Sequence, residues 1–496
     1  MWQKNRISAV IAALVLACAT TVHCVYAADV ATTSNSKQQY ADAVRLIDVW
    51  LDSQRDYEHL SGLSAAVVIG QEVIWAKGYG TIDAARSVPA TPDTIYSICS
   101  ISKLFTSVAI MQLVDAGKLR LDDDIATVLP GFDMIRSDPD SGPITIRSML
   151  SHSSGLPGEG GFANWMAPDF RFASKEELQK NLKNLRTMMQ ASDHYEYSNL
   201  AMSLLGLVVE QVSGMTYEEY AQRYILTPLK LADTRTKMPM ELYGTRLAQG
   251  FGPIRRDATR ELFKPFDTGG YVGAAGYTST VSDLAKFAAW QFRLLKNGGS
   301  EILRAATLRD MQRVQWTDPD GKVTWGLGFG VSYSGTTKIV GHTGLCPGYL
   351  SAISMVPKEE LAVIVMTNNQ VSIGDYSRPM RSILEKGRSL PAQATGKDAP
   401  DLNTYAGIYS YRNRGGEQAI VPWGKGLAVV SLPSRDPAAS LDLLRHIQGD
   451  KFRFVRDDGS LGQELTFKRN AEGKIVGHEL EWHISGRLRA LPHGNP

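Results

Sequence analysis

Runs of apolar residues at both ends of one long segment predict the strands of a single sheet. Residues 63–69 and 73–79 are short, rich in β-branched and aromatic side chains, and separated by a turn near Gly70. Such runs are typical of neighbouring strands. Three more strands of this kind are predicted far downstream, at residues 338–342, 349–356 and 361–367. The sheet is therefore expected to combine strands from the two ends of the segment.

Apolar residues spaced three and four positions apart predict helices before and between these strands. The predicted helices cover residues 38–59, 101–116, 175–189, 200–213, 217–225 and 281–295. Residues 100–300 are therefore expected to be mostly helical.

The composition changes after Arg388. Residues 389–401 contain Ser, Pro, Ala, Gly and Lys without periodicity, which is typical of a linker. Further strands are then predicted at residues 407–411, 426–432, 452–456, 464–469 and 474–482. Their spacing predicts a small β-barrel-like domain over residues 402–492, after a larger domain over residues 38–388.

The amino terminus predicts export. Lys4 and Arg6 precede an apolar run over residues 7–19, and Val25-Tyr26-Ala27 provides small residues at the positions that a signal peptidase reads. A signal peptide over residues 1–27 and a secreted or periplasmic location are therefore expected. The alternative is lipidation at Cys18, which would tether the protein to a membrane.

Charge excludes one class of partner. The sequence has 53 basic and 51 acidic residues, and removal of Lys4 and Arg6 with the signal peptide leaves 51 of each. A near-neutral chain gives no indication of nucleic-acid binding. No metal-ligand motif, phosphate loop or dinucleotide-binding fingerprint is present, so no metal or cofactor is expected.

Ser100 and Lys103 supply the first candidate chemistry. Residues three apart on a helix share one face, so the hydroxyl and the amine are expected to meet. Ser100 would open the predicted helix over residues 101–116, where unpaired N–H groups and the helix dipole favour an anion formed during acyl transfer. Serine and lysine at this spacing are common, however, and the pair alone shows little.

Two further motifs follow in order, Tyr197-Ser198-Asn199 and His342-Thr343-Gly344. With Ser100-Ile101-Ser102-Lys103 they resemble the penicillin-recognising serine hydrolases, in the branch of class C β-lactamases, D-Ala-D-Ala carboxypeptidases, D-aminopeptidases and related esterases. Other segments carry the same resemblance, namely residues 91–94, 150–157 and 273–280. It implies an α+β fold, with an antiparallel sheet flanked by helices and a helical region. The β-rich carboxyl-terminal domain resembles those appended to D-aminopeptidases.

The resemblance also implies a role for each motif residue. Ser100 matches the acylated nucleophile, and Lys103 and Tyr197 match the pair that removes its proton. Asn199 matches an amide that binds the acyl side of the substrate. The substrate-facing strand is matched by His342, Thr343 and Gly344, and the oxyanion hole by the backbone N–H groups of Ser100 and Leu345.

Neither Lys103 nor Tyr197 is a base at pH 7 unless the site shifts its pKa, because the free side chains have pKa values of about 10.4 and 10. An ammonium beside a phenol lowers the pKa of the phenol, and desolvation lowers that of the lysine. The sequence leaves the identity of the base open.

Histidine at position 342 stands where class A enzymes have the lysine of a Lys-Thr-Gly motif. Unperturbed histidine has a pKa of about 6.5 and is mostly neutral at pH 7. This change weakens the case for a dedicated β-lactamase, and it predicts a response to pH near neutrality if His342 contacts an anionic substrate group.

The expected function is therefore serine hydrolysis of peptide or amide substrates, as in D-aminopeptidases or D-Ala-D-Ala carboxypeptidases, and cell-wall-derived peptides are among the expected substrates. The alternatives are a carboxylesterase or class C-like β-lactamase, and a penicillin-binding sensor that is acylated without turnover. His152, in a serine-rich loop, is expected to make local hydrogen bonds rather than take part in chemistry.

Two cysteines would remain after removal of the signal peptide. Cys99 precedes the nucleophile, and Cys346 lies two residues after Gly344. Both should lie near the site, either as a disulfide or as two buried thiols, and the sequence does not decide between them.

Overall fold

The computed structural model describes residues 36–371, 376–390, 400–410, 415–481 and 483–491. The expected signal peptide and most of the expected linker lie outside these ranges. The chain divides into two compact units. One comprises residues 49–382 with 432–437, and the other comprises residues up to 48, 383–431 and 438 onward. A helix covers residues 36–57.

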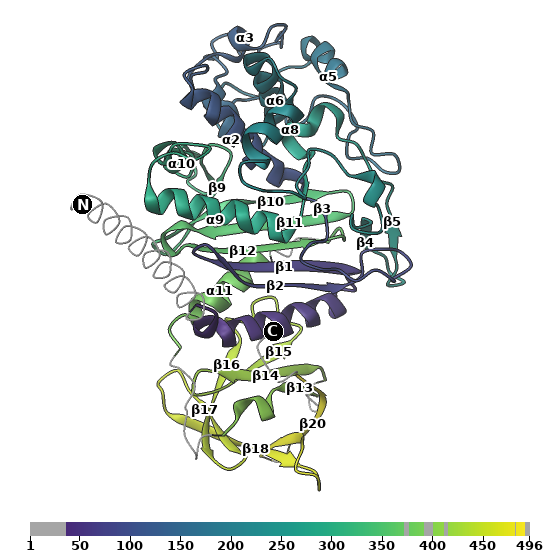
Figure 1. Ribbon diagram of the computed structural model, residues 1–496, viewed down its shortest axis with the longest axis vertical. Coiled ribbons are helices and arrows are strands. Elements are labelled where there is room, and N and C mark those ends of the chain that lie inside the picture. Colours follow the sequence, from purple (N-terminus) through teal and green to yellow (C-terminus); the bar gives the residue numbers. More distant parts are fainter. Residues whose placement is uncertain (1–35, 372–375, 391–399, 411–414, 482, 492–496) are drawn as a thin grey trace, which may run out of the picture. The chain divides into compact units, whose positions relative to one another are not determined.

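The larger unit is built on an eight-stranded antiparallel sheet (Figure 1). In spatial order its strands are β2 (Glu72–Gly80), β1 (Gly62–Ile69), β12 (Leu361–Thr367), β11 (Tyr349–Val356), β10 (Thr337–Cys346), β9 (Gly330–Ser334), β8 (Thr324–Trp325) and β7 (Trp316–Thr317). Leu63 pairs with Thr367, which places the first strands beside the last. The expected sheet is confirmed, and β7, β8 and β9 extend it.

Helices supply the rest of this unit. They are η1 (Cys99–Ile101), α2 (Ser102–Asp115), α3 (Ile125–Val128), α4 (Ile146–Leu150), α5 (Lys175–Asn181), η2 (Leu182–Asn184), α6 (Asn199–Ser213), α7 (Tyr217–Ala221), η3 (Gln222–Leu226), η4 (Met240–Leu242), η5 (Gly269–Tyr271), α8 (Val272–Ala275), α9 (Val281–Asn297), α10 (Ala305–Met311) and η6 (Pro357–Glu359). Short strand pairs join β3 (Tyr96–Ser97) to β6 (Thr278–Ser279) and β4 (Phe251–Ile254) to β5 (Arg260–Leu262). Helix α11 (Ser377–Gly387) follows the sheet along the chain.

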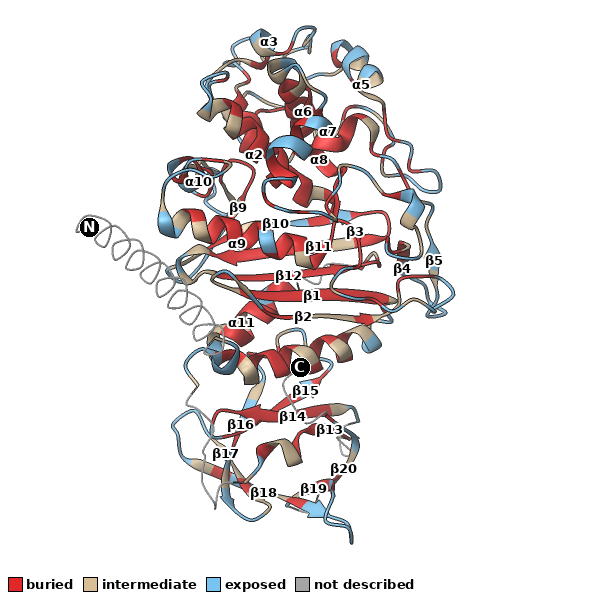
Figure 2. Cartoon of the chain, viewed as in Figure 1, coloured by how far each residue is buried: buried red, intermediate tan, exposed pale blue. Residues whose placement is uncertain are grey.

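The burial of helices α9 and α2 explains where apolar residues occur in their sequences. Helix α9 packs on β1 and β12 and buries its apolar stripe there (Figures 1 and 2). Helix α2 packs against α6 and α8 and is buried on nearly all sides, so its sequence is apolar almost throughout. Within the described ranges, no single helix has the length and apolar character needed to cross a bilayer. One pair of helices, Asn199–Ser213 and Tyr217–Leu226, reaches that length and apolar character when the two are taken together, and the pair is bent by 80°.

One predicted helix is shorter than expected. Its pattern extends to residue 189, but α5 ends at Asn181 and a single turn, η2, ends at Asn184. From there Leu185 turns to an extended conformation, and the chain continues without helix to Ser198. Thr187 is bound instead to the backbone of Ile135, so tertiary hydrogen bonds replace those of the helix.

The second unit contains a closed antiparallel barrel of eight strands, which confirms the expected barrel-like domain. Its strands are β13 (Gly407–Ser410), β14 (Glu417–Trp423), β15 (Gly426–Leu432), β16 (Leu441–Gln448), β17 (Lys451–Val455), β18 (Leu461–Arg469), β19 (Ile475–Leu480) and β20 (His483–Ala490), after a turn η7 (Leu402–Tyr405). Pairing of β13 with β20 closes it, and Tyr405, Phe452 and Phe467 fill its core. Closure leaves no unpaired edge.

Candidate active site

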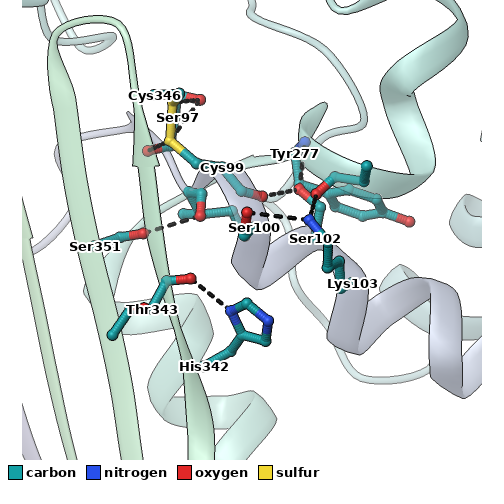
Figure 3. Close-up of a disulfide and its surroundings, with 12 residues drawn as sticks. Ser97, Cys99, Ser100, Ser102, Lys103, Tyr277, His342, Thr343, Cys346 and Ser351 are labelled. Carbon is teal, nitrogen blue, oxygen red and sulfur yellow. Dashed lines mark hydrogen bonds between the residues drawn. A yellow bond between two sulfur atoms is a disulfide. The ribbon is translucent and has the colours of Figure 1, made fainter. Parts of the chain in front are cut away.

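Ser100 and Lys103 lie where the chain enters the helical region from the sheet. Ser100 is in the turn η1, and Lys103 is in the first turn of α2 (Figure 3). Cys99, just before Ser100, has a φ of 50°, in the left-handed region that non-glycine residues seldom adopt. The Oγ of Ser102 donates to the Cys99 carbonyl and accepts from the Tyr277 N–H, at 2.5 and 3.0 Å. Ser102 therefore fixes the turn that carries Ser100, through one hydrogen bond to Cys99 and one to Tyr277.

The side chain of Lys103 is completely buried and has three polar partners. Its Nζ lies 2.7 Å from Oδ1 of Asn199, 2.9 Å from the carbonyl oxygen of Ala274 and 3.1 Å from Oγ of Ser100. A neutral amine has two N–H donors and one lone pair. Because the first two partners are carbonyl oxygens that can only accept, the lone pair is left for the hydroxyl proton of Ser100.

Burial shifts the pKa values of the two candidate bases in opposite directions. Desolvation lowers the pKa of Lys103 to about 7, although the negative charge of Glu159 opposes this shift. Desolvation also raises the pKa of Tyr197, in spite of its hydrogen bond with Ser100. The pKa of the phenol is therefore raised by burial, and not lowered as the sequence had led us to expect. Lys103 is the member of the pair that can lose its proton near neutral pH.

Tyr197 is positioned by the start of α6. Ser198 caps this helix, because its Oγ accepts from the Ala201 N–H at 2.9 Å and donates to the Pro157 carbonyl at 2.7 Å. The Ser198 N–H donates to Nδ1 of the buried His152 at 3.2 Å. The ring of His152 lies 4.4 Å from that of Tyr197. His152 thus orients the tyrosine segment, in keeping with the local role expected from sequence.

Tyr197 also contacts Lys103. Nζ of Lys103 lies 4.8 Å from the centroid of the Tyr197 ring. The phenol, the amine and the Ser100 hydroxyl therefore form one contiguous group.

Asn199 connects this group to a carboxylate that the sequence did not reveal. Its Oδ1 accepts from Lys103, and its Nδ2 donates to Oε1 of Glu159 at 2.6 Å. One amide hydrogen of Asn199 remains for the acyl-side contact expected from sequence. Glu159 follows Leu156-Pro157-Gly158 in a loop, and no periodicity or spacing marks it. Only the folded chain brings it to Asn199.

His342 is buried on β10 beside Tyr197 and Trp325, with ring centroids 6.2 and 5.6 Å away. Its Nδ1 lies 2.5 Å from the carbonyl oxygen of Thr343 and donates to it. Desolvation, aided by the positive charge of Lys103, lowers the pKa of His342 to about 3. The titration near neutrality expected from sequence is therefore moved far into the acid range, because the buried imidazolium would lose its hydration.

Strand β10 and the Ser100 turn are joined by a disulfide between Cys99 and Cys346, with a Cα–Cα distance of 5.8 Å (Figure 3). Of the two alternatives left open by the sequence, the structure has the bridge. A Cβ on Gly344 would lie 2.2 Å from the Ile98 carbonyl oxygen, so glycine permits this close approach. Ser351 also donates to that carbonyl, at 2.9 Å.

These residues border a cavity of about 1380 Å³ in the larger unit. Its lining includes Ser100, Tyr197, Asn199, His342, Thr343 and Leu345. The structure thus brings Ser100, Tyr197 and three of the predicted substrate residues, Asn199, His342 and Thr343, to one concavity. Gly344, the fourth, is not in the lining, and Lys103 is buried behind Ser100.

The family model described as Beta-lactamase matches residues 47–387. The chain belongs to the beta-lactamase family. Protein flp of Staphylococcus aureus (strain MRSA252) is 25% identical over 353 residues, which are 68% of this chain and 64% of that protein. This chain thus spans less than two thirds of protein flp. Beta-lactamase-like protein 2 of Dictyostelium discoideum is 24% identical over 394 residues, 74% of this chain and 70% of that protein.

Solved structures agree with the beta-lactamase fold. An octameric penicillin-binding protein homologue from Pyrococcus abyssi has a TM-score of 0.60 at 22% identity, with 89% of this chain and 99% of that chain covered. A beta-lactamase/D-alanine carboxypeptidase from Yersinia pestis has a TM-score of 0.58 at 22% identity, with 70% and 97% covered. Family and fold together place the chain in the beta-lactamase family, without fixing its activity or its substrate.

Replacement Tyr197→Phe is expected to lower kcat by about 10²-fold, because the phenol hydroxyl can no longer share in proton transfer. Tyr195→Phe is the matched control, since Tyr195 also lines the cavity and contacts His152. Steady-state kinetics on both variants test this role. Equal rates for Tyr197→Phe and wild type would reduce Tyr197 to a packing residue.

Replacement His342→Gln is expected to leave the midpoint of the pH–rate profile near neutrality unchanged. His342 is already neutral there because burial lowers its pKa to about 3, so the variant removes no titration from this range. The profile of kcat/KM from pH 5 to 9 measures this. A flattened profile in His342→Gln would show instead that His342 titrates near neutrality.

Proposed function

We propose that this chain is an exported serine hydrolase that forms an acyl-enzyme on Ser100, with peptide or amide substrates. The observation that supports this most directly is the environment of Lys103 Nζ. Two carbonyl oxygens take up its N–H groups, and Ser100 Oγ is 3.1 Å away. A neutral Lys103 is therefore oriented to take the proton of Ser100 as the hydroxyl attacks the substrate.

The remaining steps follow from the same group of residues. Ser100 Oγ attacks the carbonyl carbon, and its proton passes to Lys103. As the bond to the leaving group breaks, the phenol of Tyr197, kept protonated by its raised pKa, protonates the leaving nitrogen or oxygen. Lys103 returns a proton to Tyr197. Water then hydrolyses the acyl-enzyme with the same proton exchanges, and the backbone N–H groups of Ser100 and Leu345 stabilise the oxyanion.

The experiment is a substrate panel with the purified mature protein. Nitrocefin, short-chain nitrophenyl esters, and L- and D-alanine anilides separate β-lactamase, carboxylesterase and peptidase activity, the alternatives expected from sequence. A fluorophosphonate probe, which phosphonylates an activated serine, followed by intact-mass analysis tests whether Ser100 is the nucleophile. Labelling of Ser100 with hydrolysis of the anilides supports the proposal. A stable acyl-enzyme without turnover indicates a sensor, and no labelling at all contradicts the proposal.

Export is supported by the sequence of residues 1–27 alone. Amino-terminal sequencing of the protein recovered from the periplasm or medium of its host is expected to begin at Ala28. Recovery in the membrane fraction with a lipid on Cys18 would favour the tethered alternative, and a cytoplasmic chain beginning at Met1 would contradict export.

A further inference from the structure

Given the proposed function, we propose that Glu159 binds a protonated amino group on the acyl part of the substrate, which selects amino-acid amides, amino-acid esters and peptides with a free amino terminus. The first support is its position. Glu159 lines the cavity that also contains Ser100. Its Oε1 lies 2.6 Å from Nδ2 of Asn199, the residue expected to meet the acyl side of the substrate.

The carboxylate of Glu159 accepts hydrogen bonds from neutral side chains. Its Oε1 accepts from Asn199 and from Trp165 Nε1, and its Oε2 accepts from Asn164 Nδ2 at 3.1 Å. Among the described residues, no ion pair includes Glu159. A carboxylate stabilised by neutral donors keeps its negative charge available to a cationic ligand.

The nearby base reinforces this preference. Lys103 must be neutral to accept the proton of Ser100, and burial lowers its pKa to about 7. In that reactive form, Glu159 carries the only formal charge of the Glu159–Asn199–Lys103 chain. A substrate ammonium would restore neutrality to the site. Trp165, whose Nε1 donates to Glu159, also lines the cavity, and aromatic rings attract cations.

The cavity is also lined by three cations, Lys322, Arg378 and Arg381. Arg381 donates to Ser354 Oγ at 2.8 Å, and Ser354 is three residues from Ser351, which contacts the Ser100 turn. Because side chains alternate along β11, Ser354 and Ser351 point to opposite faces of the sheet. Lys322 is paired with Asp320 at 2.9 Å. On the face of β10 that carries Gly344 and meets the Ser100 turn, the strand presents the neutral His342. This arrangement favours an ammonium on the acyl side over a carboxylate on the leaving-group side.

Two matched substrates test this assignment. Alanine p-nitroanilide, as each enantiomer, and propionyl p-nitroanilide differ in the amino group alone. Wild type is expected to prefer one of the alanine enantiomers by roughly 10- to 100-fold in kcat/KM, the range for a hydrogen bond to a charged group. Glu159→Gln, which keeps the shape and removes the charge, is expected to abolish that preference. Asp169→Asn, which removes one exposed charge next to Phe170, is the matched control.

The two substrates also separate the possible failures. Hydrolysis of the propionyl compound with no preference for either alanine compound in wild type would overturn the amino-group assignment and leave the proposed function intact. Equal losses on all substrates in Glu159→Gln would likewise overturn it, and would show that Glu159 only orients Asn199. If wild type hydrolyses neither kind of anilide and Ser100 is not acylated, the proposed function itself fails, and this assignment fails with it.

A separate observation concerns the disulfide. We infer that the Cys99–Cys346 bridge is a positioning element for the two expected oxyanion donors. It joins the residue just before Ser100 to the residue just after Leu345, so each half is adjacent to one donor N–H (Figure 3). The close approach of Gly344 to Ile98 places the two backbone segments against each other at the same point. Oxyanion stabilisation depends on the exact placement of such donors.

The double variant Cys99→Ala with Cys346→Ala tests this role. It is assayed well below its melting temperature. We expect kcat to fall about 10-fold with little change in KM, and a boronic acid transition-state analogue to lose affinity by a similar factor. Wild type alkylated before and after reduction should show one bridge by intact mass. Two free thiols in protein purified without reductant, or a variant with a lower melting temperature but unchanged kcat and boronate affinity, would overturn the inference.

Discussion

Ser100→Ala is expected to abolish covalent labelling by a fluorophosphonate probe and to lower kcat/KM by about 10³-fold or more, as loss of a catalytic nucleophile does in other serine hydrolases. The physical reason is that, among the described residues, Ser100 carries the one hydroxyl that is hydrogen-bonded to Lys103 Nζ. Ser100 Oγ contacts both Lys103 Nζ and the Tyr197 phenol. Alanine removes the oxygen that forms the acyl bond and leaves the turn η1 held by Ser102.

Ser332→Ala is the matched control, because Ser332 also lines the cavity but lies on β9. This variant should keep both labelling and turnover. Intact-mass analysis after labelling, with tryptic mapping of the modified peptide, measures the outcome. Persistent labelling of Ser100→Ala at another residue, with activity retained, would show that the nucleophile lies elsewhere.

The sheet could be predicted because its strands have strong local patterns. Strand β1 is buried along most of its length, so its sequence is a continuous apolar run that is easily recognised. In the barrel, five strands were predicted and eight are present. Strand β16, with the sequence Leu-Asp-Leu-Leu-Arg-His-Ile-Gln, lacks clean alternation, and β14 contains Pro422. Pairing around a closed barrel stabilises strands that local pattern does not mark.

For the candidate site, the sequence predicted that Ser100, Lys103 and Tyr197 meet, but it did not predict their protonation states. Ser100 and Lys103 are close in sequence, and helical geometry alone predicts their contact. The identity of the base depends on desolvation, which is a property of the packed interior around Lys103 and Tyr197. Glu159 was missed for a related reason. Its role arises from a loop that meets the start of α6, and no local pattern encodes that meeting.

Lys103→Gln is expected to lower kcat by about 10³-fold or more, because the amide keeps N–H donors for Asn199 and Ala274 but has no basic lone pair. Lys338→Gln is the matched control, since Lys338 on β10 is also a partly buried lysine whose pKa desolvation lowers, and it donates to the Gln312 carbonyl. Turnover of the best substrate in the panel measures both variants. Near-normal kcat in Lys103→Gln would transfer the role of base to Tyr197.

The pH–rate profile of wild type gives the same assignment independently. Burial disfavours the ammonium form of Lys103 and lowers its pKa to about 7, so the neutral base predominates above this pH and the protonated form below it. We therefore expect kcat/KM to fall tenfold per pH unit on the acid side of a midpoint near pH 7, and to level off above it. Glu159→Gln should move this midpoint to lower pH, because the negative charge of Glu159 favours the ammonium. A midpoint that stays fixed in Glu159→Gln and vanishes in His342→Gln would assign the titration to His342 instead of Lys103.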